Sequence, residues 1–256
     1  ADNMASVQIK TSLRVDVLTV DVDGRSSVSA TGHLIAQKVT VNLDGFSKFN
    51  ADVFTTYPNG FVMDDGMVLY NIDGRSEANG TVVTKTLVAK VDGFSEFNVG
   101  SSANNARYVL NGHSKLNGGI GATTLRVELD GFSSVSSSQI TFERSAVFEI
   151  DGRSSISTKQ MSGAQGAKFT AQLDGFSKMS VGSGRASEGS VSVSGRSEFS
   201  ALKFDVHTLT VGANDYSTAD VYCSGKLRAI TTSQQARINF SGSCTVESES
   251  PTIIRK

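Results

Sequence analysis

A turn of the form Asp-Gly-Arg-Ser or Asp-Gly-Phe-Ser returns mostly every 19 to 23 residues along this 256-residue chain. Eleven copies align on the glycine position. They begin with Asp23-Gly24-Arg25-Ser26 and Asp44-Gly45-Phe46-Ser47 and end with two degenerate copies. A unit of about 20 residues cannot bury an apolar face alone. The repeat therefore predicts that each unit stacks on copies of itself.

Apolar and polar residues alternate on both sides of each turn. Val20 and Val22 before Gly24, and Val28 after it, lie an even number of positions from the glycine, whereas Asp21 lies at an odd one. Successive strand residues point to opposite faces, so each repeat is expected to hold two short strands with one face in a core. We therefore expect an all-β fold: a right-handed parallel β-helix, or β-solenoid, of about 20 residues per repeat and about 11 repeats. Residues 1–256 are expected to form a single domain.

One repeat is too long. Gly45 and Gly74 are 29 residues apart, and the surplus around Pro58-Asn59-Gly60 predicts a small hairpin near residues 53–66 that projects from the stack. Its Tyr57 and Phe61 are candidate contact residues, although an insertion with no partner is the simpler interpretation.

A serine with inward parity follows the turn in ten copies. Such hydroxyls can bond to one another or to backbone amides freed at the turn. A catalytic serine would need a base and an orienting acid at one place, so ten equivalent serines favour a structural ladder. The predicted ladder comprises nine of these residues, Ser26, Ser47, Ser76, Ser95, Ser114, Ser133, Ser154, Ser177 and Ser197, and the tenth serine, Ser217, follows a degenerate turn.

The residue after the turn glycine alternates between basic and aromatic along the chain. If each coil holds one motif, cations and rings interleave in one column and form cation–π pairs. If each coil holds two, the phenylalanines share one apolar edge, which would be an interface. Coils of about 20 residues favour the first arrangement. The candidate surface-contact phenylalanines are Phe46, Phe94, Phe132 and Phe176.

Aspartate before glycine is ordinary turn chemistry. Stacked carboxylates can also bind Ca²⁺, or act as the acid and base of a polysaccharide hydrolase. The chain lacks the Gly-Gly-x-Gly-x-Asp repeat of calcium-binding solenoids, and its three histidines show no metal-ligand spacing. We expect no metal, no cofactor and no catalytic residue.

Two further features concern covalent links and partners. Cys223 and Cys244 lie 21 residues apart, about one coil, which predicts a disulfide near the C-terminal end. The 24 basic and 25 acidic residues give a net charge of −1, so no nucleic-acid partner is expected. The chain has no run of 18 apolar residues, so no membrane span is expected. A chain that begins at Ala1 suits an exported protein whose signal has been removed, although a trimmed chain would look the same.

The units LTVDVDGRSSVSATG, TLRVELDGFSSVSSS and SVSVSGRSEFSA, with the ending CSGKLRAITTSQQARINFSGSCTVES, resemble the auto-transporter adhesin head-GIN domain family of bacterial exported proteins. The resemblance covers nearly the whole chain. It implies a right-handed parallel β-helix and an extracellular or cell-surface location. The family has no established chemistry, so no catalytic residue is carried over. Asp before the turn glycine and Arg or Phe after it depart from the family pattern.

Neither end of the chain has the helical period of a cap. Uncapped strands invite stacking or strand donation, so residues 237–256 are expected to be a C-terminal cap or donor strand, with Thr252 to Ile254 as the donor. We expect a non-enzymatic extracellular structural or adhesive protein that self-assembles end to end, as a homo-oligomer or polymer, into a filament or surface layer. The alternative is a carbohydrate-binding β-helix at the cell surface that uses the row of phenylalanines after the turn glycines. A polysaccharide-degrading β-helix is the less favoured form of this alternative.

Overall fold

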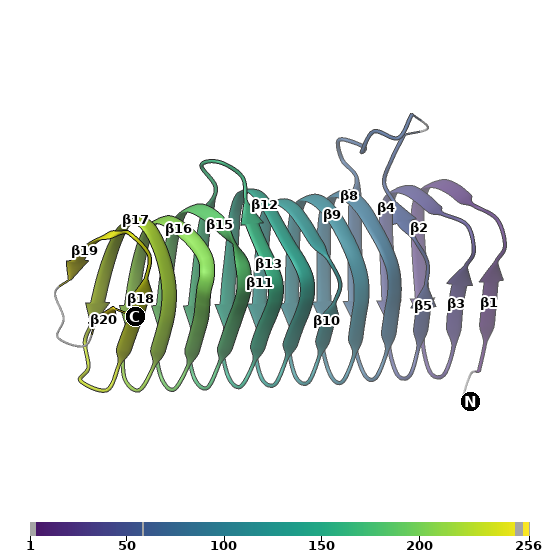
Figure 1. Ribbon diagram of the computed structural model, residues 1–256. Helices are drawn as coiled ribbons and strands as arrows, with labels where there is room; N and C mark the ends of the chain where they lie inside the picture. The colour runs from purple at the N-terminus through teal and green to yellow at the C-terminus, as the bar shows by residue number, and fades with distance from the viewer. Residues whose placement is uncertain (1–3, 58, 249–252, 256) are drawn as a thin grey trace. The chain divides into compact units, whose positions relative to one another are not determined.

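The computed structural model describes residues 4–57, 59–248 and 253–255, and its regular elements are β-strands (Figure 1). Parallel strands stack into a β-solenoid of about 12 turns spaced roughly 20 residues apart, which confirms the predicted fold class. Within the described ranges no helix is long and apolar enough to cross a membrane. The chain divides into two compact units, residues 1–123 and 124–256.

Each unit contains two stacks of strands. The pre-turn stack holds the strands that lead into the Asp-Gly turns, and the post-turn stack holds those that follow them; long strands bend and contribute to both. Unit 1 contains β1 (Ser6–Ile9), β2 (Leu13–Val22), β3 (Ser27–Ala30), β4 (Leu34–Leu43), β5 (Lys48–Asn50), β6 (Val53–Phe54), β7 (Met67–Ile72), β8 (Glu77–Val91), β9 (Glu96–Leu110), β10 (Lys115–Asn117) and the start of β11 (Ile120–Leu129).

Unit 2 continues the same pattern. It contains the rest of β11, then β12 (Ser134–Ile150), β13 (Ser155–Gly163), β14 (Lys168–Leu173), β15 (Lys178–Val193), β16 (Glu198–Ala213), β17 (Thr218–Thr231), β18 (Arg237–Ser241), β19 (Thr245–Ser248) and β20 (Ile253–Arg255).

In-register parallel pairing places residues at the same repeat position in columns, and the apolar columns form the core. In unit 1, Phe49, Ala78 and Phe97 follow one another in one column and are fully buried. Large side chains thus stack over small ones, which fills the space between coils without overcrowding. The even-numbered positions of the sequence pattern therefore face inward.

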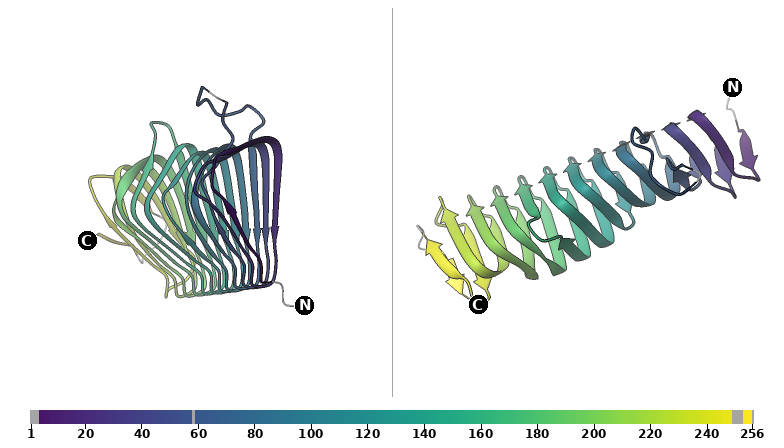
Figure 2. Two further views of the ribbon diagram at one scale, coloured as in Figure 1. Left: turned by 90° about the vertical axis from the view of Figure 1, so that its right-hand side faces the viewer. Right: turned by 90° about the horizontal axis from the view of Figure 1, so that it is seen from above.

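The projecting loop is shorter than the sequence predicted. Strand β6 lies in the stack, paired in parallel with β4 and β8, and Thr55 N donates to Val83 O of the next coil, so the loop that projects spans residues 56–65 (Figures 1 and 2). An antiparallel bridge joins Thr56 to Val62, and Tyr57 N donates to Phe61 O at 2.8 Å. Both aromatic side chains are exposed. Pro58 lies outside the described residues.

Candidate interaction surfaces

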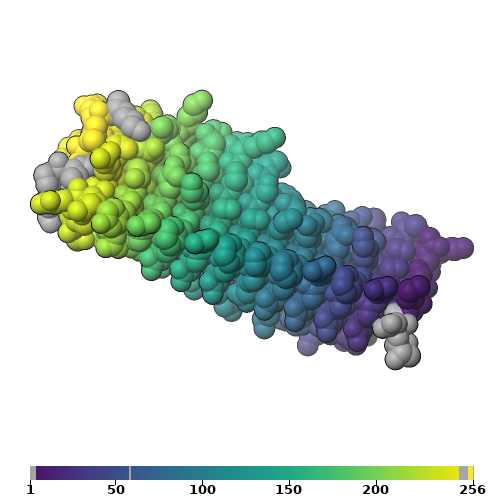
Figure 3. All heavy atoms as spheres, turned by 90° about the horizontal axis from the view of Figure 1, so that it is seen from below, coloured from purple at the N-terminus to yellow at the C-terminus, as the bar shows by residue number. Residues whose placement is uncertain are grey.

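Within each unit the Asp-Gly turns follow one another along one edge of that unit. Figure 3 gives a space-filling view of the molecule from below. In each unit, the N–H that follows a turn glycine donates to the carbonyl at the glycine position of the preceding turn. Phe46 N, for example, is 2.7 Å from Gly24 O, and Arg75 N is 2.7 Å from Gly45 O. Each coil therefore holds one motif, and the alternative edge made of phenylalanines alone is excluded.

Cations and rings interleave along this turn edge. The Arg75 Cζ atom lies 5.7 Å from the ring centroid of Phe46 and 5.5 Å from that of Phe94. In unit 2, Arg153 lies 5.7 Å from Phe132 and 5.4 Å from Phe176. The four rings are 49 to 57% exposed, and each has at least one face against a guanidinium. This contact favours cation–π attraction and leaves mainly ring edges for solvent.

All nine serines of the predicted ladder are buried. Ser47 Oγ donates to Val22 O of the preceding coil at 3.0 Å, and Ser76 Oγ accepts from Ser47 N at 3.3 Å. These bonds link neighbouring coils, and the bond to Val22 O is a second one, because Asp44 N also donates to that carbonyl at 3.0 Å. Not every serine of the ladder acts in this way, since the buried Oγ atoms of Ser154 and Ser177 have no hydrogen-bond partner among the described residues.

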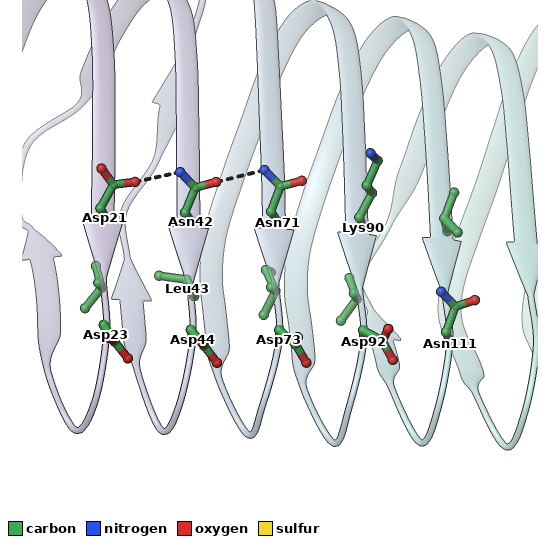
Figure 4. A pocket seen from close by; sticks show the side chains of 14 residues that line it. Asp21, Asp23, Asn42, Leu43, Asp44, Asn71, Asp73, Lys90, Asp92 and Asn111 are labelled. Atoms are coloured by element: carbon green, nitrogen blue, oxygen red, sulfur yellow. Dashed lines mark hydrogen bonds between the residues drawn. The ribbon is translucent and has the colours of Figure 1, made fainter.

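A groove of about 490 Å³ lies beside the turns of unit 1, lined by two rows of polar residues and by the apolar residues Val22, Leu43, Ile72, Val91 and Val109 (Figure 4). One of its walls is an amide chain in which Asn71 Nδ2 donates to Asn42 Oδ1 at 2.8 Å and Asn42 Nδ2 donates to Asp21 Oδ1 at 2.6 Å. The other is a column of turn residues, namely Asp23, Asp44, Asp73, Asp92 and Asn111.

The carboxylates in this groove have a local structural role. Asp73 Oδ1 accepts from Gly74 N at 2.6 Å, and Asp92 Oδ1 accepts from Gly93 N at 2.6 Å. Each carboxylate therefore satisfies an N–H of its own turn. Among the residues that the structure describes, no three His, Cys, Asp or Glu side chains are grouped so that they could hold a metal ion.

The first coil of unit 1 has an incompletely covered core, which we name the open end. Its inward residues Leu13, Val15, Leu18 and Val20 are half-buried, although their partners one coil further in have no exposed surface. Strand β1 covers β3, but no described strand covers β2. Val7 of β1 is 51% exposed beside a notch of about 580 Å³.

The last coil of unit 2 is covered differently. Strand β19 lies on β17, and β20 lies on β18 with Ile253 on Ile238 and Arg255 on Phe240. The Arg255 guanidinium is 5.9 Å from the Phe240 ring centroid and donates to Gly242 O at 3.1 Å. The tail, expected to be either a cap or a donor strand, thus pairs within its own chain through β20. Thr252 lies outside the described residues.

The predicted disulfide is not formed in this structure, because Cys223 and Cys244 are both free thiols. Both are buried, and Cys223 Sγ donates to Lys226 O at 3.2 Å. Burial, together with the neighbouring Cys244, raises the pKa of Cys223 to about 12. Cys223 is therefore a protonated, packed side chain at neutral pH.

Sequence reasoning missed two polar ladders on the outside of unit 1. An asparagine lies five residues after each of four successive turn glycines, and the side chains of these asparagines form an amide chain. Asn79 Nδ2 is 2.6 Å from Asn50 Oδ1, and Asn117 Nδ2 is 2.7 Å from Asn98 Oδ1. Lys48 Nζ lies 3.0 Å from Glu77 Oε2, and this hydrogen bond lowers the pKa of the Glu77 carboxyl. The repeated asparagine was the signal that could have revealed the first ladder.

Comparison of the chain with protein-family models, curated proteins and solved structures gave no match.

Proposed function

We propose that this chain is a non-enzymatic structural or adhesive β-solenoid of the cell exterior that associates end to end. The open end carries the proposal, because it leaves four inward apolar side chains of β2 and Val7 of β1 half-covered. The resemblance to exported head-GIN proteins supports the location.

A second copy is the occupant that fits this end best. The exposed edge consists of parallel strands with a fixed register, and the last coil of unit 2 carries the same repeat columns. Both Val246 of β19 and Ile253 of β20 are half-buried inward residues. Contact between such ends would bury apolar surface and satisfy backbone groups of the edge strands.

The matched variants Val7→Lys and Val17→Lys test the proposal. Val7 points inward and packs in register with Val28, whereas Val17 is 63% exposed and pairs in register with exposed Lys38. Sedimentation velocity at micromolar concentration, with electron microscopy, should show oligomers or filaments for the natural chain and for Val17→Lys. Val7→Lys should be monomeric, because a buried unpaired ammonium is costly. Monomers of the natural chain at every salt concentration and pH tested would overturn the proposal.

The groove of unit 1 favours glycan binding as a second candidate function. Its amide and carboxylate groups can bond to hydroxyls, and it extends across several coils (Figure 4). The turn-edge rings support this function less, because guanidinium groups lie against their faces.

Binding to a neutral glycan array would test this second function. Asn71→Leu removes a donor from the groove and should abolish binding, whereas Asn117→Leu removes an amide outside the residues that line the groove and should not. Equal binding by both variants, or none by the natural chain, would reject it.

A further inference from the structure

Each of the two terminal coils ends on a post-turn strand, β1 at the open end and β20 at the end of unit 2. At the open end the post-turn stack extends one strand further than the pre-turn stack, because β1 covers β3 while no described strand covers β2. At the end of unit 2, β20 covers β18 while no described strand covers β19, so here too the post-turn stack extends further than the pre-turn stack.

Two ends that both project on the post-turn side do not fit together. If β1 of a second copy lay on β20, a space one strand wide would remain between that copy's β2 and β19. If β20 leaves β18, the pre-turn stack of unit 2 extends one strand further than its post-turn stack. That outline complements the open end, because β2 can then lie on β19 while β1 lies on β18.

The side chains of β1 also fit β18, where β1 of a second copy would take the place of β20. Val7 and Ile9 of β1 pair with Val28 and Ala30, which lie four and six positions after the turn glycine. In unit 2 the same repeat positions of β18 are Ile238 and Phe240, in register with Ala219 and Val221. Strand β1 would therefore place Val7 on Ile238 and Ile9 on Phe240, four apolar side chains in two columns.

Strand β20 is a poorer occupant of the same site. It spans only Ile253–Arg255, and it places Arg255 on Phe240 where the inward column is otherwise apolar. A charged residue at an inward position of an edge strand is a common device against edge-to-edge association. On the pre-turn side the exchange also brings half-buried Leu18 onto half-buried Val246.

We propose that β20 is a removable cap, and that β1 of a second copy displaces it from β18 when copies join end to end. This inference rests on the proposed function and specifies its partner, register and control. In the free chain β20 occupies the binding edge and limits growth.

The experiment compares the full chain with three variants: a chain ending at Thr252, Ile253→Lys and Ile254→Lys. Ile253 contacts Ile238 in register, so both its substitution and the truncation should free β18. Ile254 is 50% exposed on the same strand, so the same charge there should leave the cap in place. A fluorescent peptide of residues 4–12 serves as the probe, with a Val7→Lys peptide as its control.

The chain ending at Thr252 and Ile253→Lys should bind the peptide at least about tenfold more tightly than the full chain, because burying one isoleucine is worth that much. The same two variants should assemble faster, and Ile254→Lys should match the full chain. The Ile253→Lys variant keeps the full length of the tail. It therefore still tests the proposal if the truncated chain fails to fold.

The outcomes separate the two proposals. Assembly that Val7→Lys blocks but that removal of β20 leaves unchanged would overturn the cap and preserve end-to-end association. Peptide binding to the uncapped chain without any oligomers would support the exchange site and overturn assembly as the function. Equal peptide binding by capped and uncapped chains would overturn the exchange.

Discussion

At the scale of single residues, the turn glycines set how closely coils approach. Gly93 has a φ of +70°, and a Cβ atom there would lie 2.5 Å from Gly74 O. Asp215 shows what a side chain does at this position, since its φ is also positive, at 57°. The bond from Tyr216 N to Gly195 O is 3.0 Å there, against 2.7 to 2.8 Å at the intact turns.

A turn glycine must adopt a positive φ and must leave space for the backbone of the neighbouring coil. The variants Gly93→Ala and Gly60→Ala separate these two requirements. Both residues have positive φ, but the space around Gly60 is open. We expect Gly60→Ala to lower the free energy of unfolding by about 1 kcal/mol, the cost of a left-handed alanine. Gly93→Ala adds a backbone clash and should lower it by roughly 3 kcal/mol or more. Denaturant unfolding measures both, and equal losses would show that close stacking contributes nothing.

At the scale of the repeated element, the sequence predicted the coil and favoured one motif per coil through the coil's length, but it left two motifs per coil open. The alternation of Arg25, Phe46 and Arg75 has a period of two repeats, which suits one motif per coil and two motifs per coil alike. Backbone bonds such as those from Phe46 N to Gly24 O and from Arg75 N to Gly45 O place consecutive turns in one column. The serine and core columns could be predicted because each has a period of one repeat.

Arg75→Met and Arg25→Met should differ in cost. The Arg75 guanidinium lies between two rings, whereas the Arg25 Cζ atom lies 5.8 Å from the centroid of Phe46 alone. Each exposed cation–π pair contributes about 0.5 to 1 kcal/mol, so Arg75→Met should destabilise unit 1 by roughly that much more. A double-mutant cycle with Phe94→Leu isolates the second pair. A coupling energy near zero would mean that the column is only a packing arrangement.

Deletion of residues 56–65 tests whether the projecting loop belongs to the fold. Phe54 pairs with Val83 and Met67 with Thr86, so the deletion leaves two residues, Thr55 and Gly66, where the next coil has Thr84 and Lys85. The loop's interactions with the stack are exposed, such as the ion pair between Lys85 Nζ and Asp64 Oδ1 at 3.8 Å, and contribute little to stability. The β-sheet circular dichroism spectrum and the melting temperature should be retained. Loss of either would make the loop part of the stack.

At the scale of the whole molecule, the repeat specifies how coils stack but not where stacking stops. The terminal coils carry the same columns as the inner ones, so their sequence alone cannot distinguish a covered coil from an open one. The Arg255 side chain on Phe240 could not be predicted, because the last copies lack the Asp-Gly turn that sets the register. Local stability should therefore be lowest in the strands that have one neighbour.

Hydrogen exchange can locate the joining surface in the natural chain. In dilute samples the amides of β1 and β20 should exchange faster than those of β8, because each of these short strands pairs on one side among the described residues. Raising the protein concentration should slow exchange in β1 and in those amides of β2 that point away from β4, because both gain a strand partner from the second copy. Exchange in β20 should become faster over the same range, since the cap is displaced. The exposed loop around Gly60 is the internal control and should not change. Slower exchange in β20 together with β1 would instead mean that copies join with the cap in place.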